Sequence, residues 1–262
     1  MSRLVVDRLC KRFGGVVAAR DVAFSVAAGE LVAMIGPNGA GKSTTFNIVG
    51  GQLRPDTGEV RLDGERISGL PARTVAARGV GRTFQIAETF QSMTVAENVQ
   101  MALMGKAGEG WSLWSRAHPR HREKAIDLLG LVGMAARADT ATNALAYGDI
   151  KRVEIALALA GDPKLLLMDE PTAGMAPPER AQLMRLVAAI ARERQIAVLF
   201  TEHDMDAVFG FADRVLVLVR GEIIAAGRPD EVRADPQVKR VYLGDMGTDA
   251  ALKAVRNEAV AS

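Results

Sequence analysis

The chain has 262 residues, of which 48% are hydrophobic and 24% are charged, and its formal net charge is only +2. This length and composition are those of an ordinary globular protein, and they exclude collagen-like, repetitive and disordered architectures. The small net charge and the 5% of aromatic residues argue against a dedicated nucleic-acid binder, which needs a basic field or stacking platforms. We therefore expect no nucleic acid among its partners.

The N-terminal segment MSRLVVDRLCKRFGG contains Arg8, Lys11 and Arg12 before any apolar run of signal-peptide length. No stretch approaches the roughly 18 uninterrupted apolar residues that a membrane span requires. These features predict a protein that is made and kept in the cytosol. The single cysteine, Cys10, has no intrachain partner for a disulfide and is expected as a small buried side chain within a strand.

Several strands and one helix surround a glycine-rich loop in the first quarter of the chain. Short alternating or apolar runs predict strands over residues 4–9, 22–26, 31–36 and 59–64. A helix is expected to begin near Lys42 and to stop at the pair Gly50 and Gly51. The segment RPDTG at 54–58 has the residues of a turn, and it separates this helix from the next strand.

The pattern becomes helical from about residue 95 to 160 and then alternates between strands and helices. Strands are predicted over 164–170 and 196–203, a helix over 177–194, and a further apolar run covers 214–227. Apolar strands that alternate with helices predict a mostly parallel sheet covered on both faces. The sequence therefore indicates an α/β fold that contains a helical lobe.

The segment GPNGAGKST fits the pattern G-x-x-x-x-G-K-[ST], and it lies between a predicted strand and a predicted helix, as a phosphate-binding loop requires. Its glycines let backbone amides converge on phosphate oxygens at a helix N-terminus. Lys42 supplies a mobile charge for the terminal phosphates, and the Ser43 hydroxyl is the expected Mg²⁺ ligand. A chance glycine turn is the alternative, but the flanking elements favour nucleotide binding. The predicted phosphate-binding residues are Gly36, Pro37, Asn38, Gly39, Ala40, Gly41, Lys42, Ser43 and Thr44.

Two carboxylates follow the apolar run in KLLLMDE, at the carboxyl end of a predicted buried strand. Open α/β sheets bind their ligands at this edge. Asp169 is expected to hold Mg²⁺ through its water shell, and Glu170 is expected to polarise the water that attacks the terminal phosphate. A solvated strand end is the alternative, and it is a poor explanation beside a phosphate loop.

His203 ends the run IAVLFTEH, and Gln85 ends the run VGRTFQ. Either residue alone reads as an ordinary polar group at a strand end. Their shared position at the mouths of strands favours a role in the site. His203 is then placed to reach the terminal phosphate, and Gln85 to sense Mg²⁺ or the attacking water.

The class of nucleotide enzyme follows from the order of the motifs. A GTPase is expected to carry an N-K-x-D motif, which is absent from the sequence, and no separate signal indicates the lid and acceptor pocket of a small-molecule kinase. The order of phosphate loop, glutamine, helical lobe, LAYGD, DE strand and histidine resembles the ATP-binding cassette (ABC) ATPases. The resemblance covers roughly residues 3–244.

This resemblance implies ATP and Mg²⁺ as cofactors and a P-loop NTPase fold. The fold has a RecA-like α/β core, an antiparallel β subdomain and an inserted α-helical subdomain. A single domain is then expected over 1–244, with the core at about 1–90 and 160–244 and the helical subdomain at about 91–159. The remaining residues, 245–262, are expected to form a weakly ordered tail.

The same resemblance assigns roles to further residues. Phe13, in KRFGG, matches the aromatic residue that stacks on adenine. The segment LAYGD stands in the position of the LSGGQ signature loop, which contacts the ATP bound by a second subunit. Its implied nucleotide-contacting residues are Ala146, Tyr147, Gly148 and Asp149.

Four positions depart from the family pattern, and one of them is Tyr147, which stands where glycine is usual. Ala146 lacks the usual serine hydroxyl, and Asp149 adds a negative charge near the phosphate. From its residue type, Asp149 is also expected to accept hydrogen bonds from the first free amides of the helix that follows. Ala176 stands where the family often has an aspartate that communicates across the dimer.

The segments LAYGD, TFQIAETF, EPTAGMAP and VKRVYLGD together resemble the ATPases of branched-chain, or hydrophobic, amino acid importers, and the long helical lobe resembles their larger ATPase subunit. The resemblance implies ATP hydrolysis coupled to import at the cytoplasmic face of the inner membrane. The implied partners are a second and different ATPase chain, transmembrane permease subunits and, indirectly, an extracytoplasmic solute-binding protein.

Two alternatives to this function remain open. One is the ATPase of a lipid or lipopolysaccharide exporter, and the other is a soluble ABC ATPase with no transporter. The atypical segment 109–124 does not decide between them. Its Trp111 and Trp114 fit either a contact with a membrane subunit or a cover of the helical lobe.

Overall fold

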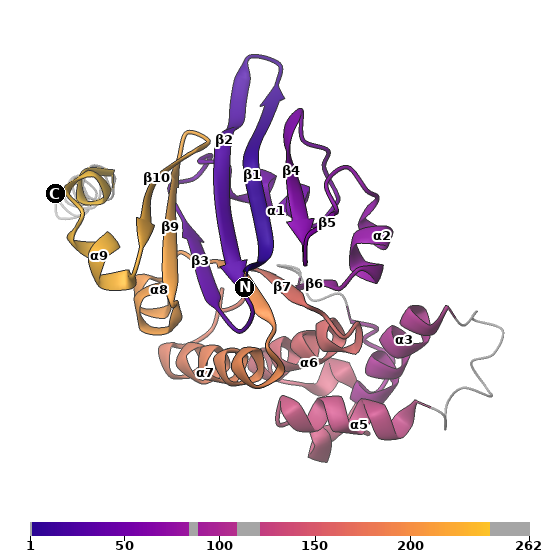
Figure 1. The fold of residues 1–262 in the computed structure, drawn as a ribbon. Helices are drawn as coiled ribbons and strands as arrows, with labels where there is room; N and C mark the ends of the chain where they lie inside the picture. Colours follow the sequence, from indigo (N-terminus) through magenta and orange to yellow (C-terminus); the bar gives the residue numbers. More distant parts are fainter. Residues whose placement is uncertain (1, 84–88, 109–120, 242–262) are drawn as a thin grey trace, which may run out of the picture.

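The computed structural model describes residues 2–83, 89–108 and 121–241, and their elements form two sheets and a group of helices (Figure 1). Gln85, Trp111, Trp114 and the predicted tail from residue 245 lie outside the described residues. In the described segments, no helix has the length and apolar character needed to cross a membrane.

Within the described residues, the central sheet has six strands in the order β10-β9-β3-β8-β7-β6. They are β3 (Leu31–Ile35), β6 (Val80–Thr83), β7 (Leu165–Asp169), β8 (Ala197–Thr201), β9 (Arg214–Val219) and β10 (Glu222–Gly227). β3 pairs in parallel with both β8 and β9, and β10 runs antiparallel to β9. The apolar run over 214–227 is therefore a hairpin, which turns at Arg220 and Gly221, both with positive φ.

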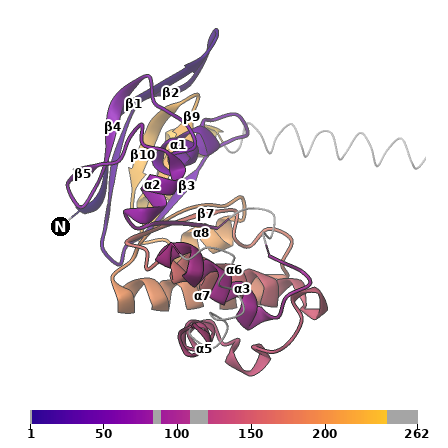
Figure 2. The same ribbon diagram turned by 90° about the vertical axis from the view of Figure 1, so that its right-hand side faces the viewer.

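The central sheet is buried on both faces, as its apolar strands predict. Side chains alternate across a strand, and those of β3 divide between two cores. Leu31, Ala33 and Ile35 belong to the core shared with the helical lobe, whereas Val32 and Met34 belong to the core shared with the second sheet. Figure 2 shows this layering, with the helical lobe on one side of the sheet and the antiparallel strands, together with the two helices of residues 42–77, on the other.

The second sheet is antiparallel, with the order β2-β1-β4-β5. Its strands are β1 (Ser2–Phe13), β2 (Val16–Ala27), β4 (Thr57–Leu62) and β5 (Glu65–Arg66). Two helices contribute to the core beneath it, α1 (Lys42–Val49) through Phe46 and α2 (Ala72–Ala77) through Val75. The expectation of a buried Cys10 is wrong, because its side chain on β1 is only half-buried and its sulfur accepts a hydrogen bond from the Asp21 N–H at 3.3 Å.

The helical lobe lies across the other face of the central sheet. It contains α3 (Val95–Ala107), α5 (Arg122–Leu131), α6 (Tyr147–Ala160) and short 3₁₀ turns at Ala135–Arg137 and Thr142–Ala144. A capping box starts α3, because the Thr94 hydroxyl accepts from the Glu97 N–H and the Glu97 carboxylate accepts from the Thr94 N–H. In the described residues, the helices that follow the lobe are α7 (Pro177–Arg194), α8 (Met205–Phe211) and α9 (Pro229–Ala234).

Candidate nucleotide-binding and hydrolysis site

The phosphate loop leaves β3 at Gly36 and enters α1 at Lys42, as the sequence predicts. Two of its glycines cannot be replaced without moving backbone. A Cβ at Gly36 would lie 2.0 Å from the carbonyl oxygen of Leu218, and one at Gly41 would lie 2.1 Å from that of Ala18. Both glycines also have φ values in the left-handed region. The loop therefore packs tightly against the neighbouring strands and opens toward solvent at Asn38, Gly39 and Ser43.

Lys42 is the cation at the centre of this loop. Its Nζ donates hydrogen bonds to the carbonyl oxygens of Gly36, at 2.6 Å, and Pro37, at 3.1 Å. Burial lowers the pKa of Lys42 from its usual 10.5, and the nearby carboxylates of Glu170 and Asp169 act in the opposite direction. The loop thus holds a buried ammonium group at a helix N-terminus, an arrangement suited to an anion such as phosphate.

Asp169 ends β7, beside the end of β8. Its Oδ1 accepts a hydrogen bond from the Thr201 hydroxyl at 2.7 Å, and its Oδ2 lies 3.7 Å from Nη2 of Arg82. The carboxylate and the Ser43 hydroxyl are the oxygen donors that Mg²⁺ prefers. Within residues 2–83, 89–108 and 121–241, no group of three or more acidic, histidine or cysteine side chains is arranged to hold a metal. The donor set fits an ion that takes its other ligands from phosphate and water, as Mg²⁺ does.

Glu170 and His203 meet beside Asp169, although 33 positions separate them in the sequence. His203 Nε2 lies 3.0 Å from Glu170 Oε1, and the histidine side chain is 52% exposed. The Glu170 backbone is left-handed, with φ of 48°, and its N–H donates to the Thr201 hydroxyl at 3.1 Å. A carboxylate held in this way beside an imidazole is equipped to accept a proton from water.

The predicted adenine-binding residue lies at the tip of the β1–β2 hairpin. Phe13 is 50% exposed, and the Nζ of Lys11 lies 5.6 Å from the centre of its ring. The side chain of Val16, which is paired with Phe13 across the hairpin, is also exposed. The hairpin therefore presents an apolar surface on which a base can stack.

The LAYGD segment forms the start of α6, but Asp149 does not cap this helix as its residue type predicts. The helix begins at Tyr147, and Ala146 occupies the N-cap with no side-chain hydrogen bond. Asp149 lies in the first turn and forms an ion pair with Arg137 at 3.1 Å. The negative charge expected near the phosphate therefore has a cationic partner.

The first turn of α6 contacts the loop that follows Glu170. Tyr147 is 45% exposed, and the Nζ of Lys151 lies 5.5 Å from the centre of its ring. The ring also lies beside Gly174, where a Cβ would be 3.5 Å from Tyr147 Cε1. In the described part of the chain, no hydrogen bond or ion pair joins residues 145–149 to the phosphate loop. Ala176, at the N-cap of α7, is exposed like Ala146. The chain thus carries two separate candidate surfaces for nucleotide.

Sequence reasoning missed two residues that contact Asp169, namely Thr201 and Arg82. Arg82 is largely buried, and its Nη1 donates to Oδ1 of Asn47 on α1 at 2.9 Å. Burial lowers the pKa of Arg82, and the charge of Asp169 opposes this effect. The sequence signal that could have identified both residues is a polar side chain near the end of an apolar strand. Arg82 has this position in VGRTF, and Thr201 has it in VLFTE. Gln85 lies outside the described residues.

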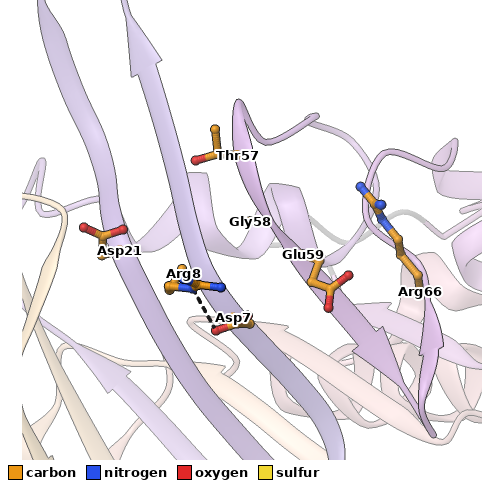
Figure 3. A pocket seen from close by; sticks show the side chains of 7 residues that line it. All are labelled: Asp7, Arg8, Asp21, Thr57, Gly58, Glu59 and Arg66. Atoms are coloured by element: carbon orange, nitrogen blue, oxygen red, sulfur yellow. Dashed lines mark ion pairs between the residues drawn. The ribbon is translucent and has the colours of Figure 1, made fainter.

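A hollow of about 470 Å³ lies on the antiparallel sheet, and Figure 3 shows its lining. Its side chains come from β1, β2, β4 and β5 and include both signs of charge. Arg8, for example, lies 3.5 Å from Asp7, and Glu59 pairs with Arg61 at 2.7 Å. This hollow shares no residue with the phosphate loop, so it is distinct from the candidate nucleotide site.

A family model described as ABC transporter matches residues 19–173, more than half of the chain, and includes the phosphate loop, the LAYGD segment and the two carboxylates. The chain belongs to the ABC transporter family. A second model, of branched-chain amino acid ATP-binding cassette transporters, matches residues 222–247 of this cassette. As a member of the family, the cassette binds and hydrolyses ATP.

Similar curated proteins cover nearly the whole cassette. The high-affinity branched-chain amino acid transport ATP-binding protein LivG of Salmonella typhimurium is 37% identical over 249 residues, 92% of this chain and 98% of that protein. BraF of Pseudomonas aeruginosa, with the same description, is 38% identical over 94% of this chain and 100% of its own length. The lipopolysaccharide export system ATP-binding protein LptB of Haemophilus influenzae is also 38% identical, over 94% and 98% of the two chains.

Solved structures show the same fold. The ADP conformation of MJ1267, an ATP-binding cassette of an ABC transporter, superposes on this cassette with a TM-score of 0.82, at 31% identity over 93% of this chain and 99% of MJ1267. This similarity supports the assignment to the P-loop NTPase class, with a RecA-like core, an antiparallel β subdomain and an inserted helical subdomain.

Proposed function

We propose that this cassette powers an ABC importer for branched-chain or related hydrophobic amino acids. The observation that carries the proposal is the match of residues 222–247, from β10 onward, to the branched-chain cassette family. Overall identity does not discriminate, because the LivG and LptB proteins are equally similar to this chain. The C-terminal match favours amino acid import over lipopolysaccharide export.

For the hydrolytic step, we assign roles according to the contacts of each side chain. The loop amides and the Lys42 ammonium would bind the terminal phosphates. The Ser43 hydroxyl, and the Asp169 carboxylate through the ion's water shell, would hold Mg²⁺. When bound, this ion neutralises charge that develops on the phosphate oxygens. Glu170 accepts a proton from the attacking water, and His203 holds the Glu170 carboxylate in place. In this scheme the phosphoryl group passes directly to water.

The second ATP-contacting surface is proposed to be the start of α6, which would face nucleotide held by a different ATPase chain. Ala146, Tyr147 and Gly148 present backbone amides at this helix N-terminus. The ion pair with Arg137 offsets the charge of Asp149, so this half-site remains compatible with phosphate. The partner in the larger-subunit assignment is the smaller ATPase subunit.

A groove of about 980 Å³ is proposed as the docking site for a transmembrane permease subunit. It lies between α2 and β6 on one side and α3 and α6 on the other. Apolar groups such as Ala102 and Leu157 line it, together with the basic side chains of Arg73 and Lys106. Arg82, three positions before Gln85, also lines the groove and contacts Asp169, which supports a link between docking and hydrolysis. Docking there places the cassette at the cytoplasmic face of the inner membrane.

The deciding experiment is purification of the intact membrane complex with its extracytoplasmic solute-binding protein, followed by a ligand screen of that protein. Our proposal requires that branched-chain or related hydrophobic amino acids bind. Recovery of a lipid-export permease in place of an amino acid permease pair would reject the substrate assignment. If the cassette does not pellet with membranes when its proposed permease partners are co-expressed, the alternative of a soluble ABC ATPase with no transporter is the better description.

A further inference from the structure

Glu202, the residue before His203, carries a carboxylate that the proposed hydrolytic scheme does not use. It follows β8 directly and is only 4% exposed. Burying a carboxylate is unfavourable unless hydrogen bonds or a cation replace the lost water. The groups that surround Glu202 must therefore compensate for its burial.

The hydrogen bonds of Glu202 come from Thr172, a residue that is 1% exposed and lies two positions after Glu170. Glu202 Oε1 accepts the Thr172 N–H at 2.8 Å and the Thr172 hydroxyl at 2.6 Å. One oxygen thus binds both the backbone and the side chain of the same residue. This pair joins the loop after β7 to the loop after β8. Thr172 is two positions from Glu170, and Glu202 is next to His203, so the pair lies close in sequence to both residues of the Glu170–His203 contact.

The residue on the other side of His203 is also fixed to the loop after β7. Arg180 forms an ion pair with Asp204, and its Nε donates to the carbonyl oxygen of Met175 at 2.7 Å. Asp204 in turn caps α8, because its Oδ1 accepts the Ala207 N–H at 2.8 Å. Both neighbours of His203 are therefore held, while its own ring is half-exposed and faces Glu170.

We propose that the Thr172–Glu202 pair is a clamp that positions Glu170 and His203 for hydrolysis. The inference rests on the hydrolytic roles proposed above for those two residues. Glu170 has a left-handed backbone, which is unfavourable for a side chain of its kind, so its orientation depends on the surrounding contacts. Without the clamp, the loop that carries Glu170 loses two of the hydrogen bonds that join it to the segment of His203. A displacement of about 1 Å in a reacting group is enough to lower a rate about 100-fold.

The test compares apolar and conservative substitutions in the intact membrane complex. The double variant Thr172→Val with Glu202→Met removes the hydroxyl and the carboxylate together and keeps the site apolar, so the fold is expected to survive. We expect its kcat to fall at least about tenfold, with the KM for ATP changed less than about twofold. Tm should fall modestly, because the buried Thr172 N–H loses its acceptor. Thr172→Ser and Glu202→Gln each preserve the donor or acceptor and should keep at least about half of the parent kcat.

A second measurement does not depend on turnover. The chain has three histidines, so the ring signal of His203 can be assigned by NMR in the purified cassette. The signal should move in the double variant and remain at its parent position in Thr172→Ser. A double variant with parent kcat, or one whose His203 signal is unchanged, would overturn the clamp. Loss of activity in Thr172→Ser equal to that in the double variant would do so as well.

The parent complex and Glu170→Gln serve as references that distinguish a failure of the clamp from a failure of the hydrolytic roles proposed for Glu170 and His203. If the parent hydrolyses ATP and Glu170→Gln does not, the proposed roles stand, and the double variant reports on the clamp alone. If Glu170→Gln turns over at the parent rate, the assignment of the base has failed, and the clamp fails with it.

Discussion

Gly148 lies at the second position of α6, in the surface proposed to face a partner's ATP, and alanine at this position separates the two explanations of LAYGD. A Cβ built there lies 3.6 Å from Met175 Cε and 3.9 Å from the Glu179 carboxyl group, which are ordinary van der Waals distances. Its φ is outside the left-handed region, so alanine needs no change of backbone. Gly148→Ala is therefore compatible with the fold of the isolated chain.

The expected change in stability is small and favourable. Alanine is preferred over glycine in a helix by about 0.5–1 kcal/mol, which corresponds to a rise in Tm of about 1–4 °C for a chain of this size. The expected change in activity has the opposite sign, because the added methyl group would occupy space needed by the phosphate of the partner's ATP. We expect hydrolysis by the assembled complex to fall at least about tenfold, equivalent to about 1.4 kcal/mol in the barrier.

The assay measures Tm and ATP binding on the purified cassette and ATP hydrolysis on the assembled complex. Gly130→Ala is the matched control, because Gly130 is an exposed glycine in α5 with no atom within 4 Å of its built Cβ. It should gain similar stability and retain hydrolysis. If Gly148→Ala hydrolyses ATP at the parent rate, the start of α6 is an ordinary helix terminus, and the proposed second surface is wrong.

Four further substitutions test the phosphate loop, the proposed base and the cation beside Asp169. Lys42→Met should raise the Kd for ATP at least about tenfold in a calorimetric titration. A Kd equal to that of the parent would contradict the role of Lys42. Because burial lowers the Lys42 pKa, the parent's ATP affinity should begin to fall at alkaline pH below 10.5, whereas Lys42→Arg should not show this loss. Glu170→Gln should stop turnover, preserve ATP binding and retain a closed dimer; turnover at the parent rate excludes Glu170 as the base. Arg82→Met removes the cation 3.7 Å from Asp169 and should shift the Mg²⁺ dependence of ATP binding to lower concentration, and no shift would contradict this electrostatic account.

The sequence predicted those elements whose signals are local. The helix that starts at Lys42 follows a glycine loop, and α7 spans Pro177–Arg194 as expected, because proline suits a first helical turn and the apolar period continues to the end. The sequence did not predict that residues 214–217 pair with the central sheet. It also did not predict the hairpin that turns at Arg220. Both features depend on which strands become neighbours, and that is settled by packing of the whole chain.

Residues of the site that were missed depend on the same long-range placement. Thr201 contacts Asp169 because β8 pairs with β7, and Arg82 reaches Asp169 because β6 lies on the other side of β7. Asp149 pairs with Arg137 across a 3₁₀ turn whose direction the sequence pattern does not specify. Residue type alone predicted a cap for Asp149, but the backbone of Ala146 already occupies that position.

The left-handed backbone of Glu170 sets stability and turnover against each other at one position. A residue with a Cβ in this region of φ and ψ destabilises the folded chain by about 1–2 kcal/mol. Glycine at the same position would not cause this destabilisation. Glycine, however, has no carboxylate to take a proton from water. The protein therefore retains an unfavourable backbone angle at the position of its proposed base. Selection for thermal stability alone would favour replacement of Glu170, although hydrolysis requires its carboxylate.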